Sequence, residues 1–453
     1  MAKTSTSILI LGAGGDLTKR LLLPGLASLL NRRDYDVQVI GAGLDDRSGE
    51  EWQEIVASSF ATVDGDPAKL GETSYIPADV TKPDEMRRLL EACAHTPVIY
   101  FALPPQVTAR VCEALREVDL PEGTRLALEK PFGVDLETAR RLNRQLTLLV
   151  PEEQIFRIDH FLGMSMVLNL LGLRFANRVM DAAWRAGDVE RVEIVYDETL
   201  GLEGRGGYYD NAGALVDMLQ SHLLEVLALV AMEPMPKLDH VELRSAIAQV
   251  LRNTRVWDGD PVASSQRGRY TAGTVGERPL PSYVDEKGVD PSRETETLAQ
   301  LTCEVQTPRW RGVPFTLRSG KALAKKITTV TLHLRPAPHI PGFSGEPRSD
   351  SITMNLKSGE VTLALTMNGS GDPFTIEQTS LTTDKDLGDL LPYGQVLEGI
   401  LDGDPLLSVR GDVAEECWRI VEPVLAAWRA GEVSLEDYAA GSTGPEGWGA
   451  ADR

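Results

Sequence analysis

The run ILILGAGGDL at residues 8–17 restricts the fold of this chain more than any other feature. Ile8 to Leu11 have the pattern of a buried strand, a glycine-rich turn follows, and a helix-like stretch extends from Leu17 to Leu30. This order of elements lets backbone N–H groups approach a pyrophosphate at the helix N-terminus. The spacing G-x-G-G-D-L departs from the full G-x-G-x-x-G pattern, so the motif alone also fits an ordinary turn.

The rest of the first third alternates short apolar runs with helix-length segments. The runs are Val37–Ile40, Val98–Ala102 and Leu126–Leu128. Strands that alternate with helices indicate a parallel, doubly wound sheet. We therefore predict a Rossmann-like dinucleotide-binding domain over residues 1–158.

The pattern changes after Arg157. Two long helical stretches, Met166–Asn177 and Asn211–Met232, precede segments from about Glu294 onward in which apolar and polar residues alternate. A period of two predicts a large, mostly antiparallel sheet with helices on one face. We predict an α+β domain for substrate binding and dimerisation over residues 159–453.

Two segments of this second part lack a regular pattern. Residues 253–293 are rich in Gly, Pro, Ser and charged side chains, which predicts a long excursion. The tail after Tyr438, AAGSTGPEGWGAADR, is expected to be irregular.

Composition excludes several classes of partner. Asp and Glu number 67 against 46 Lys and Arg, so the net charge of -21 disfavours binding to nucleic acid or to an anionic membrane. No apolar run is long enough to span a bilayer, and the N-terminal residues lack the pattern of a signal peptide. The four cysteines show no C-x-x-C spacing, which argues against a zinc site and for a reducing, cytoplasmic location.

Several further motifs follow the glycine turn in order along the chain. They are YFALPP (100–105), EKPFG (129–133), RIDHFLG (157–163), EGRGGYYDNAGALVDMLQSHLLEVLALVAME (203–233) and GVPFTLRSGKAL (312–323). With GAGGDLTKRLLLPGL, they resemble the glucose-6-phosphate dehydrogenase family over almost the whole chain. The resemblance implies oxidation of glucose 6-phosphate to 6-phosphogluconolactone, with NADP or NAD as hydride acceptor. It also implies a homodimer or homotetramer.

The resemblance makes His222 the general base for the C1 hydroxyl, a task that suits imidazole because its ordinary pKa lies near neutrality. His222 also shares a helical face with Met218 and Val226, so a purely structural histidine is the alternative. Asp159 would orient the base and stabilise its charged form. The alternative role for Asp159 is a helix cap, since a helical run follows it.

The resemblance also assigns residues that bind substrate and cofactor. The substrate residues are His160, Lys130, Glu198, Asp217, Lys321, Lys357 and Tyr393. The cofactor residues are Gly12, Gly14, Gly15, Asp16, Leu17, Asp45, Arg47, Ala102, Leu103, Pro104 and Lys130. Without the motifs, most of these charged side chains would be taken for solvated surface groups.

The chain departs from the family pattern at the position of a cofactor-binding arginine. Leu44 stands where the family commonly has an arginine for the 2′-phosphate of NADP, and Asp45 and Asp46 follow. A carboxylate at the end of this strand favours the free ribose hydroxyls of NAD. We expect NAD or dual use, although Arg47 is near enough in sequence to bind a phosphate.

Two further departures concern the substrate phosphate. Phe161 replaces a tyrosine and Met164 replaces the lysine that is the principal cation of the family motif. Loss of a charge-assisted contact costs about 1.5–3 kcal/mol. Two alternatives therefore stay open: a relative that oxidises a hexose without the 6-phosphate, and a weakly catalytic nucleotide-binding regulator.

Overall fold

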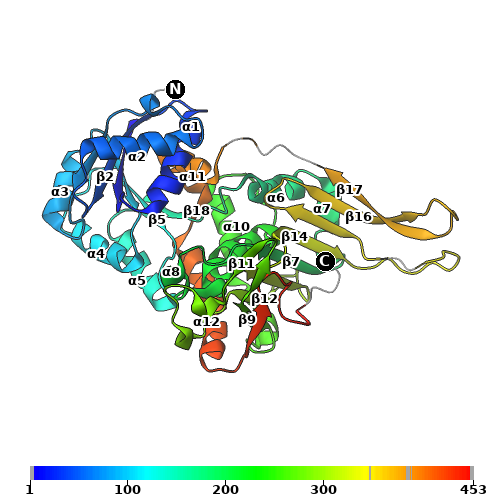
Figure 1. Ribbon diagram of the computed structural model, residues 1–453. Helices are drawn as coiled ribbons and strands as arrows, with labels where there is room; N and C mark the ends of the chain where they lie inside the picture. Colours follow the sequence, from blue (N-terminus) through cyan, green and yellow to red (C-terminus); the bar gives the residue numbers. More distant parts are fainter. Residues whose placement is uncertain (1–4, 346–347, 384–387, 389, 449–453) are drawn as a thin grey trace. The chain divides into compact units, whose positions relative to one another are not determined.

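The computed structural model describes residues 5–345, 348–383, 388 and 390–448. Their contacts divide the chain into two compact units (Figure 1). The first comprises Met1–Leu168, Met235–Ala248 and Gly388–Trp418, and the second comprises Asn169–Pro234, Gln249–Leu387 and Arg419–Arg453. Each unit has its own sheet.

The sheet of the first unit has seven strands in the order β18-β6-β5-β4-β1-β2-β3. Their bounds are β1 Ser5–Leu11, β2 Asp36–Gly43, β3 Thr73–Pro77, β4 Thr96–Phe101, β5 Arg125–Glu129, β6 Ile155–Ile158 and β18 Ser408–Val409. All neighbours are parallel except β18 and β6. The strand order reverses between β1 and β4, which is where doubly wound sheets bind ligands. The expected Rossmann-like sheet is confirmed.

Helices cover this sheet. They are α1 Leu23–Leu30, α2 Gly49–Ala61, α3 Pro83–Glu91, α4 Pro105–Leu115, α5 Leu136–Thr147 and α11 Pro392–Asp402, with the wide turn η1 Thr18–Leu22 before α1. Ser48 begins α2 with a capping box, since its hydroxyl accepts the N–H of Glu51 and the Glu51 carboxylate accepts the N–H of Ser48. Helix α11 returns late in the chain to pack on α1, where a Cβ on Gly25 would lie 2.5 Å from Cβ of Tyr393.

The sheet of the second unit has ten strands and is mostly antiparallel, as predicted. Nine follow the order β17-β16-β15-β14-β7-β13-β12-β9-β19, and β8 pairs with β12. Their bounds are β7 Val189–Asp197, β8 Thr254–Val256, β9 Ser265–Thr271, β12 Leu298–Val305, β13 Pro314–Gly320, β14 Ile327–Leu334, β15 Ser351–Asn355, β16 Val361–Asn368, β17 Ile376–Thr383 and β19 Leu435–Ala439. Two pairs, β13 with β7 and β19 with β9, are parallel.

The expectation of an irregular excursion at 253–293 is wrong in part. Strand β9 lies within the main sheet between β12 and β19, and the small hairpin β10 (Gly273–Val275) and β11 (Arg278–Leu280) follows it. Polar side chains conceal the strand in the sequence, because Ser265 and Arg267 of β9 are buried although both are polar. The residues after β19 are irregular through residue 448, as predicted, and residues 449–453 lie outside the described part.

The remaining helices are α6 Ser165–Phe175, α7 Arg178–Ala183, α8 Gly206–Tyr209, η4 Leu215–Leu223, α9 Leu224–Ala231, α10 His240–Arg252 and α12 Gly411–Arg429. Single-turn 3-10 segments are η2 Pro67–Lys69, η3 Glu152–Gln154, η5 Trp257–Gly259, η6 Tyr283–Asp285, η7 Pro291–Arg293 and η8 Pro405–Leu407. Among the described residues, no helix has both the length and the apolar character needed to cross a membrane.

Candidate functional site

The glycine turn lies at the ends of β1 and β4 and is shaped for close approach of a ligand. Gly12 has φ +82°, and its N–H donates to the carbonyl of Ala42 at 2.8 Å. A Cβ at this position would lie 2.8 Å from Cδ2 of Leu103 and would collide with the carbonyl of Ala102. Only glycine fits here, because the loop after β4 fills the adjacent space, and a tight turn of this kind precedes the pyrophosphate site in dinucleotide-binding folds. The predicted residues Gly15, Asp16, Leu17 and Pro104 flank the same turn and the start of α4.

The end of β2 brings a carboxylate and a guanidinium to the glycine turn. Oδ2 of Asp45 lies 3.3 Å from Nη2 of Arg47, and both groups border Gly14. The Arg47 guanidinium stacks over the ring of Tyr75 at 5.6 Å. Leu44, by contrast, is 81% exposed. The polar groups of Asp45 and Arg47 fit the ribose side of a dinucleotide, which supports a cofactor site at this edge.

A partly buried glutamate lies at the end of β5, next to Lys130. Glu129 accepts a hydrogen bond from the hydroxyl of Tyr100 and another from the hydroxyl of Tyr393 at 3.3 Å. Burial raises the pKa of Glu129 to about 7, and the two tyrosine hydroxyls oppose that shift. The sequence analysis missed Glu129 and Tyr100. Two features of the sequence could have indicated these residues: a carboxylate stands directly before the predicted Lys130, and a tyrosine lies in the neighbouring strand.

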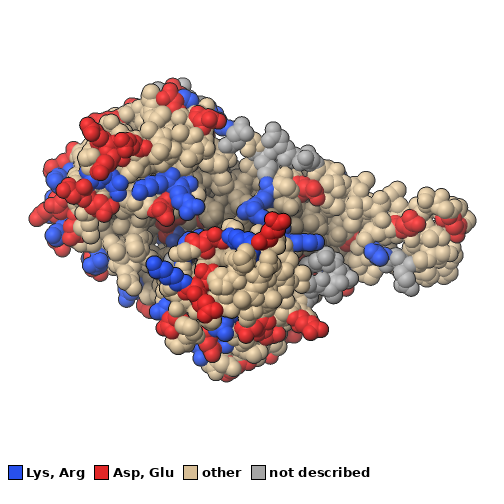
Figure 2. Space-filling model, viewed as in Figure 1, with Lys and Arg blue, Asp and Glu red and all other residues tan. Residues whose placement is uncertain are grey.

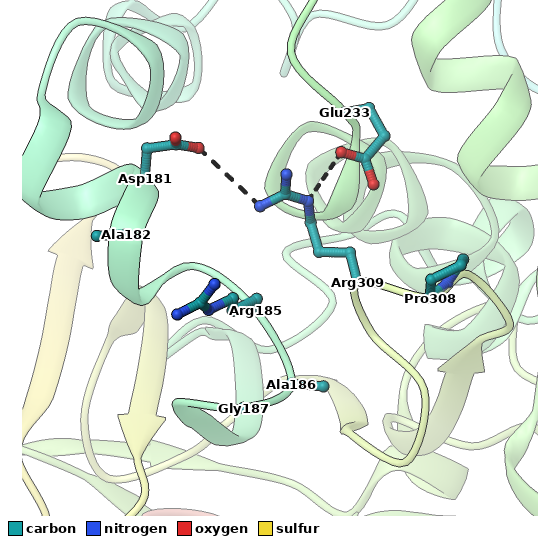
Figure 3. A pocket seen from close by; sticks show the side chains of 8 residues that line it. All are labelled: Asp181, Ala182, Arg185, Ala186, Gly187, Glu233, Pro308 and Arg309. Atoms are coloured by element: carbon teal, nitrogen blue, oxygen red, sulfur yellow. Dashed lines mark hydrogen bonds and ion pairs between the residues drawn. The ribbon is translucent and has the colours of Figure 1, made fainter.

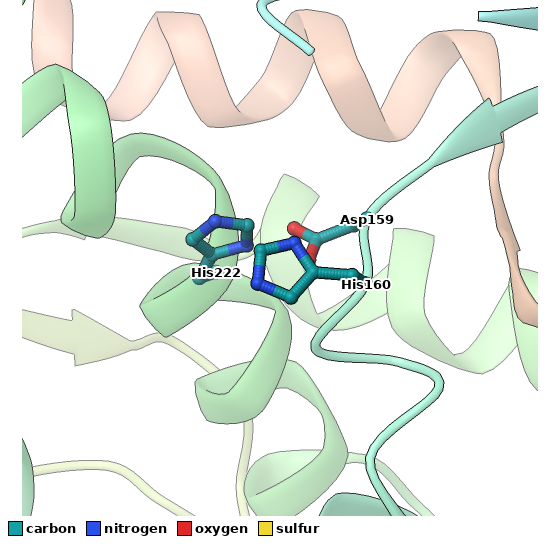
Figure 4. A group of neighbouring side chains, drawn as sticks. All are labelled: Asp159, His160 and His222. Carbon is teal, nitrogen blue, oxygen red and sulfur yellow. The ribbon is translucent and has the colours of Figure 1, made fainter. Parts of the chain in front are cut away.

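Asp159 and His160 follow β6 in the first unit. Asp159 is buried, and its Oδ1 accepts the N–H of Phe161 at 2.9 Å, so its carboxylate closes a tight turn at the start of the motif. The His160 ring stacks on Tyr393, with centroids 5.9 Å apart and planes 16° from parallel. Phe161 is buried, and Met164 is half-buried. Figure 4 shows Asp159 and His160 on this segment and His222 on its helix.

His222 and Asp217 lie on one continuous helix of the second unit, formed by η4 and α9. His222 is 1% exposed, and its helical neighbours Met218 and Val226 are buried with it. The turns from Leu215 to Leu223 are of the wide π type, which recurs at functional sites because it redirects side chains. Burial alone fits both the structural and the catalytic interpretation of His222.

Glu198 and Lys321 meet at the ends of two neighbouring strands. Strands β7 and β13 run parallel with Asp197 opposite Gly320, so the next residue of each lies at the same edge. Nζ of Lys321 donates to Oε2 of Glu198 at 2.7 Å and lies 5.1 Å from the centre of the Tyr209 ring. The structure therefore brings these two predicted substrate residues together.

Lys357 lies beside a second lysine that the sequence analysis missed. Its Nζ stands 5.1 Å from the centre of the Tyr196 ring. The close approach of the positively charged Lys357 ammonium lowers the pKa of Lys326. Two exposed ammonium groups side by side repel each other, and an anion between them would remove that repulsion. The adjacent lysines Lys325 and Lys326, which follow the GKAL motif after one alanine, could have indicated this group in the sequence.

A pocket of about 490 Å³ lies elsewhere in the second unit (Figure 3). Its charged groups are already paired: Arg309 donates to Glu233 at 2.9 Å and lies 4.0 Å from Asp181, while Arg185 binds Asp188 at 2.8 Å. None of the site residues predicted from the sequence lines it. This pocket is therefore not part of the candidate site.

These features define a class. A parallel sheet with a glycine turn, combined with an antiparallel sheet that carries a histidine helix, carboxylates and lysines, is the architecture of a two-domain, nicotinamide-dependent sugar dehydrogenase. Residues 9–169 match the family model described as glucose-6-phosphate dehydrogenase, NAD binding domain. Residues 171–451 match glucose-6-phosphate dehydrogenase, C-terminal domain. The chain belongs to the glucose-6-phosphate dehydrogenase family, which confirms the resemblance.

Individual relatives agree over nearly the whole length. The glucose-6-phosphate 1-dehydrogenase of Gluconobacter oxydans (strain 621H) is 37% identical over 461 residues, which cover 96% of this chain and 94% of the relative. The crystal structure of glucose-6-phosphate 1-dehydrogenase from Mycobacterium avium has a TM-score of 0.86 and 33% identity. A glucose-6-phosphate dehydrogenase in complex with its substrate glucose-6-phosphate has a TM-score of 0.87 and 28% identity. Both structural matches cover 98% of this chain and 96% of the other.

Proposed function

We propose that this chain oxidises the C1 hydroxyl of glucose 6-phosphate, yielding 6-phosphogluconolactone and passing a hydride to NAD or NADP. The observation that carries the proposal is the pair Lys321–Glu198 at the edge of the large sheet, in the same unit as the His222 helix. A half-buried carboxylate fixed by a lysine is suited to hold a sugar hydroxyl. The similarity to a glucose-6-phosphate dehydrogenase in complex with its substrate supports the same assignment.

His222 takes the proton from the C1 hydroxyl, and Asp159 stabilises the imidazolium that results. Glu198 and Asp217 accept hydrogen bonds from sugar hydroxyls, while Lys321 holds Glu198 in place. The dinucleotide, held at the glycine turn, supplies the hydride acceptor. Each of these protein groups therefore binds the sugar, orients a neighbouring side chain or accepts a proton.

The 6-phosphate needs cations other than the lysine that Met164 replaces. Lys326 and Lys357 provide two ammonium groups that lie together on the second unit. We assign phosphate binding to these groups. Each charge-assisted contact contributes about 1.5–3 kcal/mol, so two of them offset the missing lysine.

For the cofactor we propose NAD or dual use. Asp45 places a carboxylate beside Gly14, where it repels a 2′-phosphate and accepts hydrogen bonds from free ribose hydroxyls. Arg47, bound to Asp45 after the end of β2, is a cation that favours the 2′-phosphate. Its presence supports measurable activity with NADP.

The direct test is the initial rate of NAD(P)H formation, with glucose 6-phosphate and free glucose each crossed with NAD and NADP. We expect turnover of glucose 6-phosphate with both dinucleotides. Turnover of free glucose alone would replace the proposal by oxidation of a hexose without phosphate. Binding of a dinucleotide without turnover of either sugar would favour the nucleotide-binding regulator.

We further propose a homodimer, formed through the edge of the large sheet, in the cytoplasm. Strand β17 is the last strand of the sheet and is exposed along almost its full length, with Leu381 56% exposed and Met367 of β16 55% exposed. Uncharged residues predominate over the β16–β17 hairpin (Figure 2). An open strand edge with apolar side chains favours pairing with a second copy. Light scattering distinguishes monomer, dimer and tetramer, and Leu381→Asp should shift the mass toward the monomer.

A further inference from the structure

A buried carboxyl group stands at the start of the helix that carries Asp217 and His222. Glu296 is 7% exposed, and its Oε1 accepts the backbone N–H of Leu215 at 2.9 Å. Its backbone carbonyl accepts the N–H of Ala214 at 3.2 Å. Glu296 thus binds two consecutive amides in the first turn, where a helix has no carbonyls of its own to accept them.

The residue before these amides makes room for the carboxyl. Gly213 has φ +69°, and a Cβ there would lie 2.6 Å from Cδ and 2.7 Å from Oε2 of Glu296. Any larger residue would displace the carboxyl group or bend the turn. Glycine at this position and the carboxyl opposite it therefore fix the helix start together.

The same short segment also holds Lys321. The carbonyl of Thr297 accepts the N–H of Lys321 at 2.9 Å. The Tyr438 hydroxyl lies 2.8 Å from the Thr297 hydroxyl and donates to the carbonyl of Lys321 at 2.8 Å. Glu296 and Thr297, which immediately precede β12, thus tie the helix and the lysine to one point of the sheet.

Charged and titratable groups face Glu296 from several elements. Burial raises its pKa to about 7, while the N–H of Leu215 and the positive charge of Arg267 favour the ionised form. Tyr209 and Tyr283 are close enough for the charge of Glu296 to raise their own pKa values. The positive end of a helix dipole stabilises a carboxylate at this place.

We infer that Glu296 is a positioning residue, whose carboxyl group sets the helix start and thereby the places of Asp217 and His222 relative to Lys321. The inference rests on the proposed function, which gives those three residues their roles. Displacement of a reacting group by about 1 Å costs roughly 100-fold in rate. A single anchor at the first turn therefore controls turnover without contacting the substrate.

The test compares Glu296→Ala, Glu296→Gln and a control, Glu286→Ala. Glu286 also lies in the second unit, and its carboxylate accepts the Tyr270 hydroxyl at 3.1 Å. Glu296→Ala removes the acceptor for Leu215, so kcat should fall at least about tenfold while KM for the dinucleotide is unchanged. Glu296→Gln keeps an oxygen acceptor for the N–H of Leu215, so its kcat should lie within about threefold of the wild-type value. Glu286→Ala should leave kcat unchanged.

A second readout does not depend on turnover. In protein with ¹³C-labelled histidine rings, the His222 signal is assigned by its loss in His222→Asn. Glu296→Ala should shift this signal, whereas Glu286→Ala should not. Wild-type kcat in Glu296→Ala, together with an unshifted His222 signal, overturns the inference. If the wild-type chain does not oxidise glucose 6-phosphate, the proposed function fails, and the His222 signal alone decides whether Glu296 positions the helix.

Discussion

The ammonium of Lys321 and the carboxylate of Glu198 form a largely buried ion pair, with side-chain exposures of 5% and 22% and a distance of 2.7 Å. The pair is fixed by the backbone as well, because the N–H of Glu198 donates to the carbonyl of Gly320 at 2.8 Å. An ammonium has three donors, so the bond to Glu198 leaves others for a sugar. The lysine therefore holds the carboxylate, and the proposed function gives its remaining donors to the substrate.

Replacement of this lysine tests that double role. Lys321→Met removes the cation and leaves Glu198 without its hydrogen-bond donor, which is costly for a half-buried carboxylate. KM for glucose 6-phosphate should rise by at least about tenfold, while KM for the dinucleotide should not change. The matched control is Lys325→Met, at an exposed position in the following loop. Steady-state kinetics on both variants decide the matter, and equal KM values would remove Lys321 from the site.

His222→Asn tests the general base. Asparagine preserves the volume and a hydrogen-bonding side chain but cannot accept the C1 proton, so kcat should fall by about 100-fold or more. Dinucleotide affinity, measured by fluorescence titration, should stay near the wild-type value. His240→Asn is the control, since His240 is half-exposed on α10 and lies 3.5 Å from Asp404. Unchanged turnover in His222→Asn would return the histidine to its structural interpretation.

Met164→Lys tests the missing phosphate contact. A lysine restores one charge-assisted contact, so KM for glucose 6-phosphate should fall by at least about tenfold. The control for net charge is Leu238→Lys, at an exposed position of the same unit, whose KM should match the wild type. No improvement in Met164→Lys would mean that Lys326 and Lys357 already satisfy the anion or that the substrate lacks a phosphate.

Leu44→Arg tests cofactor choice. Leu44 is 81% exposed, so the substitution should cost little stability and adds a cation beside Asp45. The ratio of kcat/KM for NADP to that for NAD should rise at least about tenfold, because a 2′-phosphate gains a charge-assisted contact. Leu148→Arg, at another exposed leucine of the same unit, controls for charge alone. An unshifted ratio would refute the role of this position.

The raised pKa of Glu129 leads us to expect that the free energy of unfolding depends on pH. Burial raises its pKa from the ordinary 4.5 to about 7 in the folded chain. The folded state then binds the proton more tightly than the unfolded state. The contribution of protonated Glu129 to the free energy of unfolding is therefore complete below about pH 4.5 and is lost as the pH rises through 7. The loss is on the order of 3 kcal/mol.

Urea unfolding at pH 5, 6, 7 and 8 checks this prediction. Glu129→Gln should reduce the fall in unfolding free energy between pH 5 and pH 8, while the exposed Glu117→Gln should not. Glu296, whose pKa is also raised to about 7, accounts for a second part of the fall. An identical pH profile in Glu129→Gln and the wild type would contradict the burial argument.

The sequence by itself determined the layers of both sheets and the family. The strand–glycine–helix order at Gly12 and the period-two strands after Glu294 are local patterns, since each side chain's direction follows from backbone geometry. The motifs also identified Lys321 and Glu198, although 123 residues separate them. What the pattern did not predict was β9, because its buried Arg267 reads as a surface residue until its partners are known.

Only the tertiary structure decided which distant groups meet. Gly388–Trp418 packs with the first unit, which places Tyr393 against Glu129 and His160. Glu296 reaches the helix start across 81 residues of sequence, and nothing local to TETL indicates it. Burial and the resulting pKa shifts depend on what surrounds a group in space, so no periodicity in the chain reveals them. The sequence names the chemical groups, and the packing of the chain sets their partners and charge.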